Sequence, residues 1–192
     1  MRERRKREVG GRILTFFFFF FLLPYLFHIR LAGVIMTTMN PAYRASELQH
    51  AANLVGIKGI VLQPQIKSSN YHQILKEAGN IPSLDFVFEV GDQHAQPGCV
   101  AFNDLLKKAD FDASSERSSC HEPANIQFTS GTTGSPKGSV LSHFNIVNNA
   151  DSFARRLLLT ESDVLVIPLP LYHCFGLNLG VVSVISRCGD CI

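Results

Sequence analysis

Apolar positions between residues 31 and 90 follow strand spacing and helix spacing in turn. Leu31–Met36 is a short apolar run typical of a buried strand, and Pro41 fixes the loop after it. A helix is expected over Ser46–Val55, ended by Gly56, because its apolar positions share one helical face: Leu48, Ala51, Ala52 and Val55. The pattern therefore predicts a strand that leads into an amphipathic helix.

The following segments repeat this alternation. Gly59–Gln63 and Leu84–Val90 have strand-like composition, and Tyr71–Ala78 between them predicts a second amphipathic helix that ends at Gly79. Strands that alternate with helices form parallel sheets covered by helices. We therefore expect an α/β fold with a mostly parallel sheet and flanking helices.

The C-terminal part predicts one strand and two further helices. Ser142 is a suitable N-cap for a helix with this apolar stripe: Ile146, Val147, Ala150, Phe153, Ala154 and Leu157. Asp163–Ile167 has the composition of a buried strand, which the prolines of Pro168–Pro170 end. Leu177–Ile185 is apolar but too short to cross a bilayer, so we expect a core helix there.

Two polar stretches are expected to support the fold rather than to carry chemistry. Gln93–Glu122 is interpreted as a surface connection with a short helix around Leu105 and Leu106. Tyr43 and Arg44 are expected to anchor the loop before the first helix.

Composition indicates a globular protein and argues against nucleic-acid binding. The 192 residues, 46% of them hydrophobic, suffice for one domain with its own core. Met1–Arg12 carries six basic and two acidic residues of a chain whose formal net charge is only +2, so the remainder has no basic face. Five irregularly spaced cysteines fit a reducing compartment. We expect no metal site, and we interpret the pair in Cys188-Gly189-Asp190-Cys191 as structural or incidental.

The first thirty residues are a basic, phenylalanine-rich tail. Arginines and a lysine precede the apolar run Ile13–Phe27, which resembles a signal anchor. Fifteen helical residues span about 22 Å, short of a hydrocarbon core of about 30 Å. Six consecutive phenylalanines are also what a pyrimidine-rich non-coding tract would encode. We hypothesise either membrane attachment through Ile13–Phe27 or a wrongly assigned exon boundary.

One segment has a composition suited to phosphate binding. Glycines expose backbone N–H groups, which together with hydroxyls and one lysine form an anion site. Strand-like Asn125–Phe128 and Ser139–Leu141 flank the segment, which argues against a flexible linker. It is not a Walker A loop, because Lys137 does not directly follow a glycine. The candidate phosphate-binding residues are Thr129, Ser130, Gly131, Thr132, Thr133, Gly134, Ser135, Pro136, Lys137 and Gly138.

This segment, together with Asn40–Leu48, resembles the adenylate-forming (AMP-binding) superfamily of acyl-CoA synthetases, firefly luciferases and peptide-synthetase adenylation domains. The similarity is greatest to the mitochondrial medium-chain acyl-CoA ligases and covers residues 31–192. It implies an incomplete N-terminal domain of an adenylate-forming enzyme, with residues 1–30 as a separate tail. It also implies a mitochondrial ligase that joins a medium-chain fatty acid to CoA through an acyl-adenylate, using ATP and Mg²⁺.

A second stretch, Leu171–Gly176 after the proline turn, is similar to another motif of this superfamily. The resemblance implies that His173 positions the carboxylate and acyl group of the substrate and gates its entry. Judged without the family, His173 is a core residue beside Tyr172 and Phe175. His143, at a helix start, is expected to be structural.

Two other functions stay open. Beside a ligase fragment, the alternatives are a catalytically inactive, membrane-attached truncated homologue and an unrelated phosphate-binding domain, although no Walker spacing or GxGxxG supports the latter. The resemblance implies that the 192 residues alone have no ligase activity. Acyl chain length, oligomeric state and the native status of residues 1–30 do not follow from the sequence.

Overall fold

A seven-stranded sheet organises the protein. The computed structural model describes residues 13–16, 33–91, 95–104, 119–129, 136–187 and 190–191. All neighbouring strands of the sheet are parallel except the last pair, which is antiparallel. In spatial order the strands are β7 (Val100–Ala101), β6 (Phe86–Glu89), β3 (Gly59–Leu62), β1 (Ile13–Phe16), β2 (Ile35–Thr38), β8 (Pro123–Thr129) and β9 (Lys137–Ser142). The mostly parallel α/β fold predicted from the sequence is confirmed.

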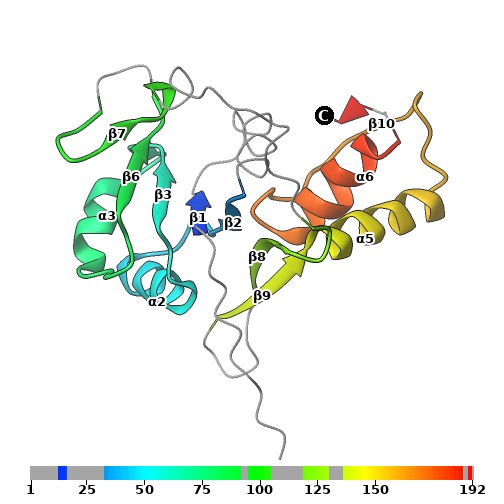
Figure 1. Ribbon diagram of the computed structural model, residues 1–192. Coiled ribbons are helices and arrows are strands. Elements are labelled where there is room, and N and C mark those ends of the chain that lie inside the picture. Colours follow the sequence, from blue (N-terminus) through cyan, green and yellow to red (C-terminus); the bar gives the residue numbers. More distant parts are fainter. Residues whose placement is uncertain are drawn as a thin grey trace, which may run out of the picture.

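The helices form two groups along the sheet (Figure 1). Helices α2 and α3 lie together on the β3–β6 side, whereas α5, α6 and the π-helical segment η1 lie beside the β8–β9 pair. Their bounds are α2 (Ala45–Val55), α3 (Tyr71–Ala78), α5 (His143–Arg156), η1 (Phe175–Val182) and α6 (Ser183–Ile185). Two small ladders complete the described structure: β4 (Gln65–Ile66) with β5 (Ser69–Asn70), and β10 (Val164–Leu165) with β11 (Asp190–Cys191).

The predicted helix boundaries agree with the structure. Gly56 adopts a positive φ of 68° and ends α2, and α3 has the predicted bounds. Ser142 caps α5 by accepting a hydrogen bond from the Asn145 N–H at 3.1 Å. The apolar stripe of α5 is only partly buried, because Val147 and Leu157 are exposed.

The loop before α2 is held as predicted for Tyr43 and Arg44. The Tyr43 N–H donates to the Asn40 carbonyl, and its side chain packs against the core under α2. The Arg44 N–H donates to the Glu47 carboxylate at 2.9 Å. Both residues therefore fix the start of the helix.

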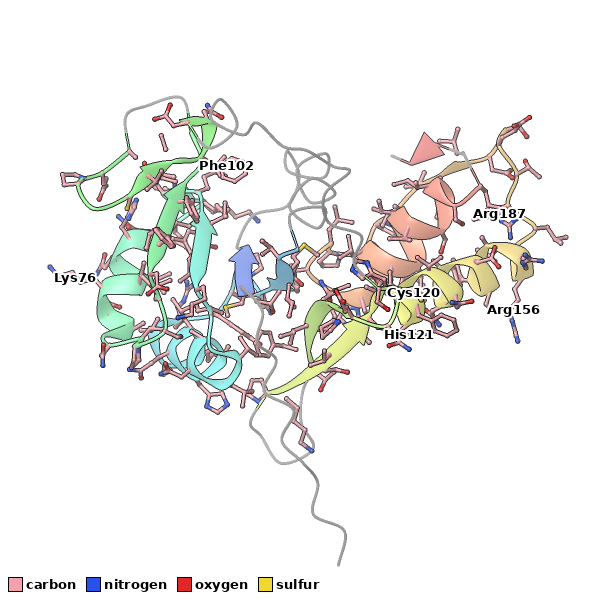
Figure 2. The ribbon with its side chains drawn as sticks, in the orientation of Figure 1. Lys76, Phe102, Cys120, His121, Arg156 and Arg187 are labelled. Atoms are coloured by element: carbon pink, nitrogen blue, oxygen red, sulfur yellow. The ribbon has the colours of Figure 1, made fainter. Side chains whose placement is uncertain are left out.

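Alternating side chains divide the core between the two faces of the sheet. Ile35 faces the larger cluster, which α2 and α3 complete, while Met36 faces a smaller cluster with Val61, Phe102 and Leu177. Figure 2 shows Phe102 near the end of β7. Because Leu177 belongs to η1, the smaller cluster ties the C-terminal helices to the sheet.

Two strand predictions need correction. The strand predicted over Leu31–Met36 is β2, which begins at Ile35, and residues 31 and 32 lie outside the described ranges. The expected buried strand Asp163–Ile167 is only the two-residue β10, and Val164 and Val166 are exposed. β10 pairs with β11 alone, and that two-stranded ladder does not cover these apolar side chains.

The interpretation of Gln93–Glu122 as a surface connection was wrong in part. Val100–Ala101 forms the edge strand β7, and Phe102 is buried. The helix expected around Leu105 and Leu106 falls outside the described residues. The segment therefore extends the sheet, a role that its polar composition hid.

Part of the N-terminal tail lies in the sheet. Ile13–Phe16 pairs in parallel with both β2 and β3. The rest of the tail, residues 1–12 and 17–30, is outside the described ranges, so the tail hypotheses stay predictions. Among the described residues, no helix has the length and apolar character needed to cross a membrane.

Candidate functional site

The two strands that flank the phosphate-binding candidates form an antiparallel hairpin. Thr129 ends β8 opposite Lys137, the first residue of β9, and the Thr129 hydroxyl donates to the Lys137 carbonyl at 3.5 Å. This confirms the predicted strands on both sides of the segment. Ser130–Ser135 lie outside the described residues, so the structure fixes where the loop starts and ends.

The ends of this loop face solvent. Thr129, Lys137 and Gly138 are exposed, and Pro136 is half-buried. An exposed hydroxyl and an exposed ammonium therefore lie at the two ends of a glycine-rich turn. The Lys137 ammonium is available to an anionic ligand, whereas the single O–H of Thr129 is directed at the Lys137 carbonyl.

Gly138 has a packing role that the composition did not reveal. A Cβ at this position would lie 3.2 Å from Ile126 Cγ2 and 3.3 Å from Val55 Cγ1. The absence of a side chain at Gly138 lets β9 approach β8 and the end of α2 closely. Gly138 therefore supports the loop through packing.

Buried polar residues connect the loop to the middle of the sheet. The Thr37 hydroxyl donates to the Ile126 carbonyl at 2.9 Å, and Gln127 Nε2 donates to the Thr38 hydroxyl at 3.4 Å. Sequence reasoning missed Thr38 and Gln127. Their signal was a pair of threonines directly after an apolar run, at the carboxyl end of a strand, where parallel α/β folds place their ligands.

Asn125 is a further buried polar residue, on β8. Neither its amide nitrogen nor its amide oxygen has a hydrogen-bond partner within the described structure. Buried polar atoms without partners are uncommon in proteins and often mark functional sites. Other unpartnered buried polar atoms occur elsewhere in the described structure, and those of Asn125 are the ones on the strand that leads directly into the loop.

His173 lies on a segment that is tethered to the same edge of the sheet. The Thr38 hydroxyl donates to the Tyr172 carbonyl at 2.9 Å, so the segment crosses the carboxyl end of β2. Since β2 is the parallel neighbour of β8, the candidate phosphate-binding loop departs from the same end of the sheet. The structure therefore brings the two predicted motifs to one edge of the sheet.

The imidazole of His173 is exposed and oriented. Its Nδ1 accepts a hydrogen bond from the Phe175 N–H at 3.2 Å, which leaves the proton of the neutral ring on Nε2. The expectation that His173 is a core residue when judged alone was wrong, because the side chain is exposed. His143 is the first residue of α5, as predicted.

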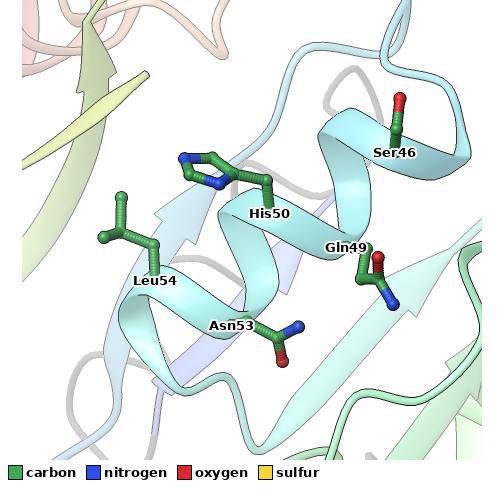
Figure 3. A pocket seen from close by; sticks show the side chains of 5 residues that line it. All are labelled: Ser46, Gln49, His50, Asn53 and Leu54. Atoms are coloured by element: carbon green, nitrogen blue, oxygen red, sulfur yellow. The ribbon is translucent and has the colours of Figure 1, made fainter. Parts of the chain in front are cut away.

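A surface hollow on α2 is a separate feature. Figure 3 shows the side chains that line it: Ser46, Gln49, His50, Asn53 and Leu54. None of them belongs to the loop or to the His173 segment. We therefore do not assign the hollow to the candidate site.

Comparison with protein families identifies the chain. The family described as AMP-binding enzyme matches residues 25–192, and thus begins before the boundary at residue 31 expected from the sequence. Among similar proteins, the medium-chain acyl-CoA ligase ACSF2, mitochondrial, of Bos taurus is 41% identical over 170 residues, covering 76% of this chain. The acyl-CoA ligase sidI of Aspergillus fumigatus is 32% identical over 169 residues, covering 81% of this chain. This chain spans 27% of the bovine protein and 28% of the fungal one.

Solved structures agree with this result. The anthranilate CoA ligase AuaEII in complex with anthranoyl-AMP superposes with a TM-score of 0.82 at 20% identity, over 94% of this chain and 35% of that one. ATP-bound MatB from Rhodopseudomonas palustris superposes with a TM-score of 0.73 at 26% identity, over 95% of this chain and 35% of that one. The family match covers most of this chain, and the fold is the one that these ligases have. The chain belongs to the AMP-binding enzyme family.

Proposed function

We propose that the chain is the part of a fatty acid–CoA ligase that binds the phosphates of ATP. The observation that carries this proposal is the Thr129–Lys137 hairpin end, with its exposed donors, on the same sheet edge as the His173 segment. Membership of the AMP-binding enzyme family supports it. In this reaction ATP supplies the adenylyl group that activates the carboxylate, and CoA supplies the thiol that receives the acyl group.

The residues present fit a polyphosphate. Thr129 and Lys137 are exposed at the loop ends, and the sequence between them adds two glycines and four hydroxyls. Backbone N–H groups and hydroxyls of Thr129–Gly138 hold the phosphate oxygens, and Lys137 contributes a point charge. Preorganised donors of this kind stabilise charge without a protein nucleophile.

Mg²⁺ fits this site through the phosphates. Thr129–Gly138 contains no carboxylate, and Mg²⁺ is commonly bound through substrate phosphates and water with one or two carboxylates. The loop residues therefore bind the phosphates, and the metal ion reaches the site with them.

His173 is proposed as a positioning residue for the fatty carboxylate. The Phe175 N–H fixes the ring, and the bond between Thr38 and the Tyr172 carbonyl holds the segment against the sheet. With Nδ1 occupied, Nε2–H is the group left to donate to a carboxylate oxygen. The same exposed ring would lie at the entrance for the acyl group.

The names of the relatives support a medium-chain substrate and a mitochondrial location. Several mammalian proteins described as medium-chain acyl-CoA ligase ACSF2, mitochondrial, match over 76% of this chain or more. We propose the same substrate class and compartment for the native protein. The AMP-binding domain is proposed to include residues 31–192.

Acyl-CoA formation by the native polypeptide that carries this sequence tests the proposal. The assay supplies ATP, Mg²⁺, CoA and fatty acids of increasing chain length to the unchanged protein, Lys137→Ala and Lys76→Ala. Lys76 is a suitable control because Figure 2 shows it projecting from α3, away from the β8–β9 hairpin. We expect a medium-chain optimum and a loss of about tenfold or more in kcat/KM for Lys137→Ala alone, as one charge-assisted hydrogen bond implies. Equal kcat/KM in the two variants, or no acyl-CoA from the unchanged protein, would contradict the proposal.

A further inference from the structure

Three side chains with metal-binding atoms meet at the outer strands of the sheet. His72 is in the first turn of α3, Glu89 ends β6, and Cys99 lies directly before β7. Their ligand atoms all lie within 4.8 Å of one another. The cluster is outside the candidate ATP site, since β6 and β7 are at the opposite end of the strand order from β8 and β9.

The negative charge of Glu89 is buried, and few positive charges or hydrogen-bond donors compensate it in the described structure. The side chain is only 8% exposed, and a buried carboxylate is costly unless cations or donors compensate it. Its Oε2 accepts a hydrogen bond from the Gln96 N–H at 3.1 Å. Within the described ranges, the ion pair with His72 is the only one that Glu89 makes, and it requires a protonated ring.

The approach of His72 to Glu89 is short but is not a well-formed hydrogen bond. His72 Nε2 lies 3.0 Å from Glu89 Oε2, yet this buried nitrogen has no partner of acceptable hydrogen-bond geometry in the described structure. Two ligand atoms of one cation approach each other in this way, because each directs a lone pair at the ion rather than at the other atom.

Each of the three donor atoms is of a type that zinc binds. Zn²⁺ binds imidazole nitrogen, thiolate sulfur and carboxylate oxygen at about 2.0–2.3 Å. At tetrahedral angles such ligands are about 3.3–3.8 Å apart, so side-chain adjustments of about 1 Å suffice to close a cluster of this size. Hard cations such as Mg²⁺ and Ca²⁺ are disfavoured, because they prefer oxygen ligands alone.

We propose that His72, Glu89 and Cys99 form a zinc-binding site with three protein ligands. The ion joins α3, β6 and the turn before β7, and so fastens the two-residue edge strand to the helix beside it. Sequence analysis predicted no metal site, because the three residues are far apart in the chain and follow no known ligand spacing. The parallel sheet brings them together.

Zinc binding by the purified, reduced 192-residue chain tests the proposal. The cysteines of Cys188-Gly189-Asp190-Cys191 are also at metal-binding spacing, so every protein carries Cys188→Ser and Cys191→Ser. In this background Cys99→Ser, His72→Gln and Glu89→Gln each remove one ligand. Cys120→Ser is the matched control, because Cys120 is an exposed free cysteine outside the cluster.

Zinc content after dialysis and the thiolate-to-metal charge-transfer band of the Co²⁺-substituted protein are the two measurements. We expect about one zinc per chain in the background protein and in Cys120→Ser. Removal of a ligand should weaken zinc binding by about tenfold or more, and Cys99→Ser should also lose the Co²⁺–thiolate band. Far-ultraviolet circular dichroism identifies any variant that fails to fold.

Thermal unfolding adds an independent measurement. Zinc bound to the folded chain should raise the Tm of the background protein and of Cys120→Ser, but not that of Cys99→Ser. Less than stoichiometric zinc in the background protein would overturn the proposal. So would a folded Cys99→Ser variant that keeps the charge-transfer band or the zinc-dependent Tm shift.

Discussion

The cluster under α2 and α3 and the segment from Leu157 to Ile185 are both rich in apolar residues, but the first part of that segment leaves most of its apolar side chains exposed, and burial resumes only in η1, where Leu177 and Val181 are buried. In the first region Leu48 is 1% exposed and contributes to a continuous cluster against β2 and β3. In the second, Leu158 is 81% and Val166 is 68% exposed. An apolar pattern therefore indicates that a residue is suited to burial. Whether the side chain is covered by other described residues depends on how the helices and strands are arranged.

The sharpest test of this comparison replaces one apolar residue in each region. Leu48→Ala should lower the free energy of unfolding by about 2–5 kcal/mol, because it leaves a cavity in a closed cluster. Val166→Ala should change it by at most about 0.5 kcal/mol, because the side chain is already in water. Urea denaturation measures both. A similar loss in the two variants would remove the distinction between the regions.

A second test asks whether the C-terminal segment, despite its exposed residues, is tightly packed at one point. A Cβ at Gly176 would lie 2.6 Å from the Pro170 carbonyl oxygen, which is backbone and cannot rotate away. Gly176→Ala should therefore lower the free energy of unfolding by about 1–3 kcal/mol. Gly91→Ala is the control, because nothing lies within 4 Å of its added Cβ. Equal urea midpoints for the two variants would show that η1 is not held against this turn.

The hydrogen bond from the Thr38 hydroxyl on β2 to the Tyr172 carbonyl in the C-terminal segment gives a third prediction. Thr38→Val keeps the side-chain shape but removes the hydroxyl that donates to the Tyr172 carbonyl, at a cost of about 1 kcal/mol. Hydrogen exchange should increase in residues 171–177. Thr129→Val, at an exposed position, should leave exchange there unchanged. Unchanged exchange in Thr38→Val would mean that this bond does not hold the His173 segment to the sheet.

The smallest effect is expected at Asp163, before β10. Hydrogen bonds from the backbone N–H and hydroxyl of Thr160 lower the pKa of its carboxyl group. A lowered folded-state pKa contributes stability above the unfolded pKa of about 3.9, and this contribution disappears as pH falls through the folded pKa. Asp163→Asn should therefore have a slightly lower Tm than the unchanged protein at pH 7, with the difference shrinking as pH falls through the folded-state pKa of Asp163. A difference that does not change with pH would assign the effect to geometry rather than charge.

The sequence predicted elements well where local chemistry decides them. Gly56 and Ser142 set helix ends through backbone conformation and capping, and both agree with the structure. Asp163–Ile167 was wrong because strand burial depends on neighbours that no local pattern specifies. The polar composition before β7 likewise hid an edge strand. An edge strand needs hydrogen bonds to only one neighbouring strand, here β6, so its sequence need not be strongly apolar.

The candidate site was predictable in composition but not in its support. Thr129 and Lys137 were recognised from a run of glycines and hydroxyls, and the structure places them opposite each other. Thr38, Gln127 and the packing of Gly138 depend on contacts between segments distant in sequence. Those contacts become visible only when the strand order is known.

The central claim is that Lys137 and the loop before it bind the phosphates of ATP. Equilibrium dialysis with labelled ATP and Mg²⁺ tests it directly in the 192-residue chain, in Lys137→Ala and in the Lys76→Ala control. The loss of one charge-assisted hydrogen bond should weaken ATP binding about tenfold or more in Lys137→Ala and leave Lys76→Ala unchanged. ATP binding of equal strength in the unchanged chain and in Lys137→Ala would contradict the account.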